Sequence, residues 1–261
     1  MFFDLDDTLL WDEKSIQEAF DLTCEAASKQ FGVDAKALED AVRQEARALY
    51  ASYETYPFTQ IIGINPFEGL WGTFDDPGEQ FQQMKEIVPT YQNEAWTKGL
   101  AQLGIEDEAA GELLARSFID NRIASPFLYE ETFDVLDALK GRYQLVLMTN
   151  GAPSLQRKKL EITPELLPYF DHVLISGEVG VGKPDVHIYK EALALCDVQA
   201  EEAIMVGDNR MTDILGANRV GIPSVWINHH GAGRSEVEPT YEIKRLNGLL
   251  EILEQSVELN R

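Results

Sequence analysis

The sequence after Pro126 alternates between short apolar runs and segments with helical spacing, and this alternation strongly constrains the fold. Strands separated by about 10–15 helical residues are typical of right-handed βαβ units, which build parallel sheets covered on both faces. A last segment, "YEIKRLNGLLEILEQSV", predicts an edge strand and a closing helix. The other predicted strands lie within "YQLVLMTNG", "HVLISG", "AIMVGDN" and "PSVWINHHG". We therefore expect an α/β fold with a Rossmann-like core of parallel strands.

From about Glu13 to Asn121 the sequence predicts helices, because apolar residues recur at helical spacing with almost no strand-like alternation. One stretch inside it, "GINPFEGLWG", is predicted to be a packed loop. A short apolar strand, "FFDL", precedes the helical segment and belongs with the later strands. We expect an α/β core of residues 1–14 and 122–261, interrupted by an inserted all-helical domain of residues 15–121. Because this first strand is unusually short, we also expect a few further residues upstream.

Acidic residues outnumber lysines and arginines by 45 to 22, which gives the chain a net charge of −23. Nucleic-acid binding relies on cationic patches, so we expect no nucleic-acid partner. The apolar runs are too short to span a bilayer, and no signal-like segment opens the chain, so we expect a cytoplasmic protein without a membrane partner. An anion could bind only where a cation, a lysine or backbone amides make the site locally positive.

Several conspicuous side chains are predicted to have only structural roles. The basic run 157–159 is expected to be an exposed helix face, and His229 and His230 are expected to be loop residues. Cys24 and Cys196 are too few and too far apart for a disulfide framework, so we expect two buried, reduced thiols. Four aromatic residues of the helical segment are expected to form its core rather than to contact a substrate: Tyr53, Phe67, Trp71 and Trp96.

Polar residues follow the predicted strands at their carboxyl ends, where open parallel sheets bind ligands. Carboxylates are hard oxygen ligands for Mg²⁺, whereas a hydroxyl, a lysine and backbone amides can hold phosphoryl oxygens. The set therefore predicts a site for Mg²⁺ and phosphate. Taken singly, each motif also has a structural interpretation as a turn or a helix N-cap. The residues are Asp4 and Asp6, Thr149 and Asn150, Lys183, Asp208 and Asp213.

The order of these motifs resembles the haloacid dehalogenase (HAD) superfamily. "DLDDTLL" is similar to its first motif, Thr149 to its second, Lys183 followed by Pro184 to its third, and "GDNRMTD" to its fourth. The helical insertion looks like the C1 cap of that superfamily. "TNG", "GEVGVGKPD" and "GIPSVWIN" are most similar to members that are phosphatases of small metabolites and nucleotides.

The resemblance implies a role for each residue. Asp4 would be the nucleophile that forms an aspartyl-phosphate, and Asp6 would be the acid and base. Mg²⁺ would be held by Asp4, Asp208 and the main-chain carbonyl of Asp6, while Asp213 would hold Lys183 or a metal-bound water. Asp7 would be a turn or cap residue. The phosphate would be bound by Thr149, Asn150, Gly151 and Lys183.

The predicted function is a Mg²⁺-dependent phosphomonoesterase whose partner is a small phosphate ester. Phosphoserine, phosphoglycolate, a nucleoside monophosphate and a sugar phosphate are all open as substrates, and the sequence does not predict an oligomeric state. A phosphomutase would share the same residues. A haloacid dehalogenase would need neither the acid Asp6 nor the metal ligand Asp208, and a catalytically silent binding protein would not need the complete set.

Overall fold

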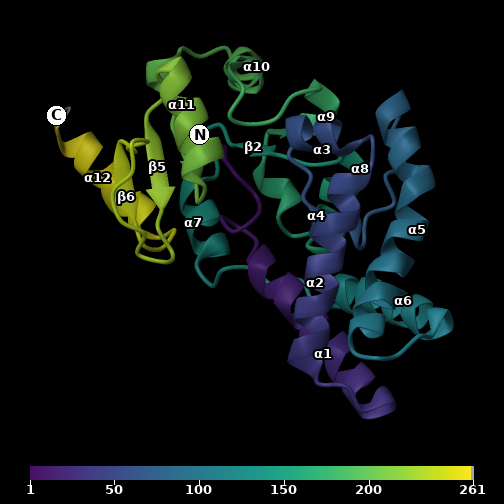
Figure 1. The fold of residues 1–261 in the computed structure, drawn as a ribbon. Helices are drawn as coiled ribbons and strands as arrows, with labels where there is room; N and C mark the ends of the chain where they lie inside the picture. Colours follow the sequence, from purple (N-terminus) through teal and green to yellow (C-terminus); the bar gives the residue numbers. More distant parts are fainter. Residues whose placement is uncertain (260–261) are drawn as a thin grey trace. The chain divides into compact units, whose positions relative to one another are not determined.

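The computed structural model describes the backbone of residues 1–259 and the side chains of residues 1–255 (Figure 1). Its internal contacts divide the chain into two compact units. The α/β unit consists of Met1–Trp11, Leu128–Gly151 and the chain from Thr163 on, and the helical unit consists of Asp12–Phe127 and Ala152–Ile162. The chain therefore passes between the two units four times, whereas the insertion that we expected would require only two passages.

The α/β unit is built on a six-stranded sheet with the order β3-β2-β1-β4-β5-β6. Every neighbouring pair is parallel, and Phe2 of the central strand β1 faces Val146 on β2 and Met205 on β4. All residues of β1, β2, β4 and β5 are buried, as expected for parallel strands covered on both faces. This confirms the predicted α/β fold class. The strands are β1 (Phe2–Phe3), β2 (Val146–Thr149), β3 (His172–Ile175), β4 (Met205–Gly207), β5 (Ser224–Ile227) and β6 (Tyr241–Ile243).

Helices follow the strands of this unit in the predicted alternation. Side chains that point to one face of the sheet, including Phe2, Val146 and Met205, pack with Tyr189 of α10 and Ala217 of α11. The helices are α7 (Thr132–Leu139), α9 (Ser176–Val179), α10 (Val186–Cys196), α11 (Leu215–Val220) and α12 (Gly248–Leu259), with a π-helical turn at Arg210–Ile214 and 3₁₀ turns at Leu167–Tyr169 and Ala200–Glu202.

The helical unit has its own apolar core, in which Phe20 packs against Trp96 and Phe118. Of the four aromatic residues predicted for this core, Trp71 and Trp96 are buried in it, and Tyr53 and Phe67 pack against it while only partly buried. Asp34 and Asp107 accept hydrogen bonds as N-caps and begin α2 and α6. The helices are α1 (Asp12–Phe31), α2 (Ala35–Ser52), α3 (Tyr56–Ile62), α4 (Pro66–Gly69), α5 (Glu79–Gln102), α6 (Glu108–Ala124) and α8 (Pro153–Ile162).

Three local predictions differ from the structure. The stretch predicted as a loop contains the short helix α4, because Asn65 and Glu68 form a capping box at its start. Lys159 of the basic run is only 1% exposed, so the prediction of an exposed face is wrong at this position. Both cysteines are free, but Cys196 is only half-buried.

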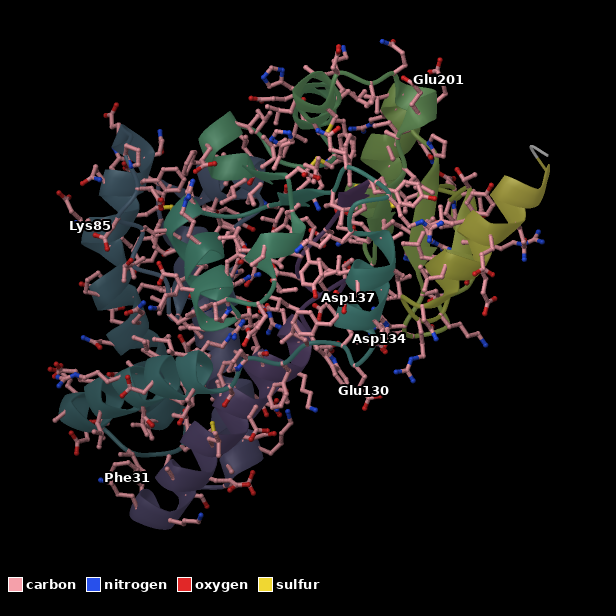
Figure 2. The ribbon with its side chains drawn as sticks, turned by 180° about the vertical axis from the view of Figure 1, so that it is seen from behind. Phe31, Lys85, Glu130, Asp134, Asp137 and Glu201 are labelled. Atoms are coloured by element: carbon pink, nitrogen blue, oxygen red, sulfur yellow. The ribbon has the colours of Figure 1, made fainter. Side chains whose placement is uncertain are left out.

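The acidic excess lies largely on exposed positions. Figure 2 labels Glu130, Asp134 and Asp137, which lie on α7 and just before it, and Glu201, which lies in the 3₁₀ turn Ala200–Glu202. Within the described residues, no helix has the length and apolar character needed to cross a membrane.

Candidate active site

Asp4 follows the central strand directly, at its carboxyl end. Its backbone amide donates to the carbonyl oxygen of Val206 over 3.0 Å, which ties this residue to the neighbouring strand β4. The apolar pair Phe2–Phe3 occupies the buried sheet, and the acid begins where the sheet ends. Asp4 is 8% exposed, so its carboxylate is largely removed from water.

Lys183 connects two carboxylates at this point. Its Nζ donates to Oδ1 of Asp4 over 2.6 Å and to Oδ1 of Asp213 over 2.7 Å. Burial alone would lower the pKa of Lys183, but the carboxylates of Asp213 and Asp4 raise it above its ordinary value. The lysine therefore stays charged and supplies the local positive charge that an anion requires.

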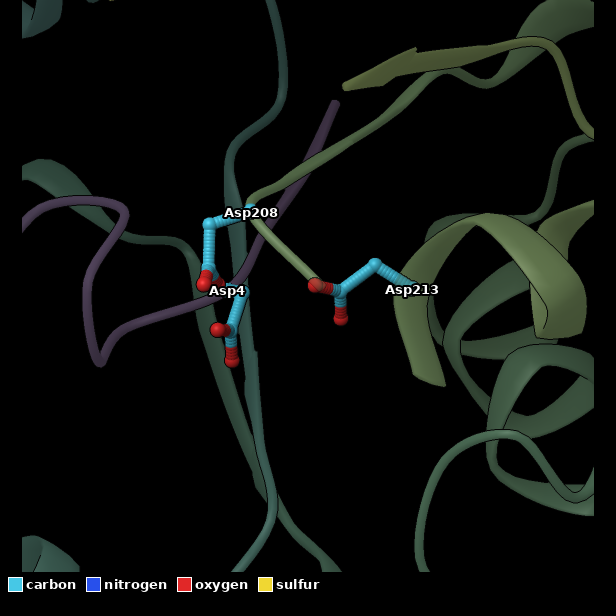
Figure 3. Close-up of side chains that lie close together, drawn as sticks. All are labelled: Asp4, Asp208 and Asp213. Carbon is cyan, nitrogen blue, oxygen red and sulfur yellow. The ribbon is translucent and has the colours of Figure 1, made fainter. Parts of the chain in front are cut away.

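Asp208 joins Asp4 and Asp213 in a cluster whose carboxylate oxygens lie within 4.8 Å of one another (Figure 3). Burial, followed by repulsion from Asp213 and Asp4, raises the pKa of Asp208 to about 9. Burial is also the main cause that raises the pKa of Asp4 to about 6, although Lys183 opposes this shift. Such crowded carboxylates are hard oxygen donors that a divalent cation would neutralise, so this donor set fits Mg²⁺.

Asp213 is held in place by the chain around β4. Its Oδ2 accepts a hydrogen bond from the backbone amide of Asn209 over 3.0 Å. A Cβ atom added at Gly207 would lie 2.2 Å from this same oxygen, a separation that real Cβ atoms do not show. Position 207 must therefore be glycine for Asp213 to reach Lys183.

We expect Gly207→Ala to lower the free energy of unfolding by about 1–3 kcal/mol, because the added methyl group overpacks a buried, hydrogen-bonded carboxylate. Denaturant unfolding of the purified variant measures this change. Gly233→Ala is the matched control, since a Cβ atom there would have no neighbour within 4 Å. Equal stability of the two variants would show that Asp213 can move away from Gly207 without cost.

The loop after β2 is held against the loop that carries Lys183. Nδ2 of Asn150 donates to the carbonyl oxygen of Lys183 over 2.9 Å, and the amide of Lys183 donates back to Oδ1 of Asn150 over 2.8 Å. Thr149, at the end of β2, is 1% exposed. The amide of Gly151 donates to Oγ of Ser176 over 2.8 Å, so it would have to leave this partner to bind a phosphate.

Asp6 lies in the loop after Asp4 and is half-buried, outside the three-carboxylate cluster. The next residue, Asp7, has a left-handed backbone with φ of 55°, and Nε2 of His229 donates to its carbonyl oxygen over 2.8 Å. The ring of His229 stacks on Tyr129 at 4.5 Å. His229 is a loop residue as predicted, and it fastens the turn that follows Asp6.

Three residues that support the site were not singled out in the sequence. Ser176 accepts from the Gly151 amide, and Gly207 makes room for Asp213. Nε1 of Trp226 donates to the carbonyl oxygen of Asp208 over 2.6 Å and so holds the backbone of that acid. Gly207 is the first residue of the motif "GDNRMTD" and Trp226 lies in β5 near the predicted acids, but the sequence alone assigns neither of them a role.

Comparison with known proteins identifies the family. A profile of the haloacid dehalogenase-like hydrolases matches residues 1–221. The chain belongs to this family. A phosphoserine phosphatase of Thermus thermophilus is 35% identical to it over 231 residues, which cover 87% of this chain and 88% of the relative. The pyrimidine 5′-nucleotidase YjjG of Escherichia coli is 36% identical over 212 residues, which cover 74% of this chain and 93% of the relative.

The fold of this hydrolase also agrees with solved structures. The putative HAD-hydrolase YfnB of Bacillus subtilis, whose crystal structure is bound to magnesium, matches with a TM-score of 0.66 at 22% identity. The match covers 97% of this chain and 96% of YfnB. The superfamily expected from the motifs is thus confirmed, and the chain is an enzyme of the hydrolase class.

Proposed function

We propose that this hydrolase is a Mg²⁺-dependent phosphomonoesterase that acts on a small metabolite through an aspartyl-phosphate on Asp4. The observation that carries the proposal is the buried ammonium group of Lys183, which both Asp4 and Asp213 contact at the end of the central strand. This arrangement combines a nucleophile with the positive charge that a phosphate dianion needs. The domain roles expected from the sequence, a catalytic core and a cap that selects the substrate, belong to the same proposal.

In the proposed mechanism, a carboxylate oxygen of Asp4 attacks phosphorus in line with the leaving oxygen. Asp6 donates a proton to that oxygen and later accepts one from the water that hydrolyses the aspartyl-phosphate. Lys183 and Thr149 contact the non-bridging oxygens, with the amide of Asn150 as a further donor and the amide of Gly151 as another once it leaves Oγ of Ser176. Asp213 holds Lys183 in place.

Asp4, Asp208 and the main-chain carbonyl of Asp6 would hold Mg²⁺, which neutralises the charge of the phosphate when bound. The three crowded carboxylates support this assignment because their mutual repulsion favours a cation among them.

The direct test is a phosphate-release screen over small phosphate esters in the presence of Mg²⁺. The long match to a phosphoserine phosphatase makes phosphoserine the first substrate to try, and the match to YjjG makes a pyrimidine nucleoside monophosphate the second. Phosphoglycolate and sugar phosphates complete the panel. Release from none of these esters would argue against a metabolite phosphatase.

The same assays separate the alternatives that share this fold. A phosphomutase would return the phosphoryl group to the sugar phosphate rather than to water, which product analysis detects. A haloacid dehalogenase would release halide from a 2-haloacid in the presence of a chelator. A silent binding protein would bind an ester without releasing phosphate.

We expect Asp6→Asn to affect substrates according to their leaving group. The kcat for alkyl phosphates should fall about 10²–10⁴-fold, because their leaving oxygen needs a proton from Asp6. An activated aryl phosphate should lose far less, since its phenolate departs without protonation. Steady-state kinetics with matched alkyl and aryl esters measure the difference, and equal losses would assign Asp6 to metal binding alone.

A further inference from the structure

The helical unit contains a buried charge network made of Asp12, Glu68, Arg122 and Lys159. These residues are between 1% and 6% exposed. A terminal nitrogen of Arg122 donates to Oδ1 of Asp12, and Nζ of Lys159 donates to Oε1 of Glu68 over 3.0 Å. Nζ of Lys159 also lies 3.8 Å from Oδ1 of Asp12, and Nε2 of Gln156 donates to Oε1 of Glu68 over 3.2 Å. The network therefore links α1, α4, α6 and α8.

Stability alone does not account for these charges. Two cations and two acids must lose their hydration to be buried, and apolar side chains of similar size often stabilise a core equally well or better. A buried charge network does restrict which side chains can pair, so it fixes how the connected helices are placed. The effect of the network therefore depends on which parts of the chain the connected helices keep in place.

Two of the connected helices begin where the chain leaves the candidate active site. Asp12 is the first residue of α1, which follows the loop carrying Asp4 and Asp6. Lys159 lies on α8, which begins at Pro153, directly after the loop formed by Thr149, Asn150 and Gly151. Each catalytic loop thus runs straight into a helix of the network.

Each of these loops is also fastened on its other side, within the α/β unit. Asn150 exchanges two hydrogen bonds with Lys183, and the carbonyl of Asp7 accepts from His229. Each loop therefore connects a fastened point in the α/β unit to a helix of the network. A shift of α8 relative to α1 would have to be absorbed by the loops themselves.

We propose that Lys159 is a positioning residue that holds α8 to α1 through Asp12 and to α4 through Glu68, and thereby keeps the loop with Asp4 in place relative to the loop with Thr149. The proposal rests on the proposed function for its effect on catalysis. The effect of Lys159 on the positions of the two loops does not depend on any substrate.

The test is the double variant Glu68→Gln with Lys159→Met, which removes the ion pair without leaving an uncompensated buried charge. The matched control is Glu161→Gln with Lys158→Met, because Lys158 and Glu161 form an ion pair at 3.3 Å on the exposed face of the same helix. For the test variant we expect kcat to fall about 10–100-fold with KM changed by less than about threefold, as a misplaced catalytic group predicts. The control should remain near the parent enzyme.

Hydrogen exchange without substrate gives a second readout. We expect faster exchange in peptides covering residues 4–12 and 149–154 of the test variant, but not of the control. If no ester is hydrolysed, this exchange result still decides the structural part of the proposal. Unchanged kcat with unchanged exchange would overturn it, and so would a rise in KM alone, because that result would make Lys159 a substrate-binding group.

A milder variant covers the case in which the double variant does not fold. Gln156→Leu removes the hydrogen bond from α8 to Glu68 while both ion pairs remain. We expect a smaller loss of kcat, about 3–10-fold, together with faster exchange in the same two peptides. Parent values for both measurements would overturn the proposal.

Discussion

Asp4→Asn is expected to lower kcat for phosphate release by about 10⁴-fold or more, because the neutral amide neither attacks phosphorus nor balances the charge of a metal. The fold should persist, since asparagine has the same size and can still accept a hydrogen bond from Lys183. Phosphate release by the purified variant at saturating Mg²⁺, with a circular dichroism spectrum as a check on folding, measures the effect.

Asp7→Asn is the matched control for this experiment. Asp7 is a neighbouring acid outside the three-carboxylate cluster, and its left-handed backbone, with φ of 55°, suits asparagine. Its activity should stay within about threefold of the parent, as for other substitutions away from the reacting atoms. Near-normal turnover by Asp4→Asn would remove Asp4 from the mechanism.

Removal of divalent cations is expected to lower phosphate release by about 10³-fold or more, because Lys183 alone would face both the phosphate and three carboxylates. Added Mg²⁺ should restore the activity. Ca²⁺ should not, since its larger and more flexible coordination shell would misplace Asp4 relative to phosphorus. Assays after exhaustive chelation, followed by titration with each cation, measure these effects.

Asp208→Asn tests the same metal site by changing a proposed ligand instead of removing the cation. This variant should need a higher Mg²⁺ concentration for half-maximal activity, because it removes one charged ligand from the cluster. Glu202→Gln, an exposed acid in the 3₁₀ turn before β4, serves as the control. Phosphate release that survives complete chelation would contradict the proposed cofactor.

Much of the α/β unit could be predicted from the sequence because its strands carry a local signal. The runs around Val146 and Met205 are apolar and bounded by turn residues, and polar side chains follow where the strands end. Parallel topology brings those ends to one edge of the sheet. That rule predicted that Asp4, Lys183 and the pair Asp208 and Asp213, which come from three distant parts of the sequence, would meet. The catalytic and metal-binding roles of these residues stay predictions.

What the sequence did not reveal depends on tertiary partners. Helical spacing places Lys158 and Lys159 side by side on α8 but does not say that Lys159 faces Glu68 and Asp12. For the same reason, the sequence predicts α8 as part of the α/β core, because it follows strand β2. In the structure, α8 belongs to the helical unit. The need for glycine at position 207 is likewise visible only once Asp213 is in place.

The central position of β1 has a consequence for how the enzyme matures during translation. Phe2 and Phe3 are synthesised long before their partners, which lie on β2 and β4, at Val146–Leu147 and Met205–Val206. At about 5–20 residues per second, roughly 10–40 s pass before both partners have been synthesised. Such distant pairing also makes folding slow relative to local helix formation. Asp4, the proposed nucleophile, is thus made long before the strand β4 to which its backbone amide donates. An incomplete chain that ends before β4 therefore carries Asp4 without the carboxylates of Asp208 and Asp213.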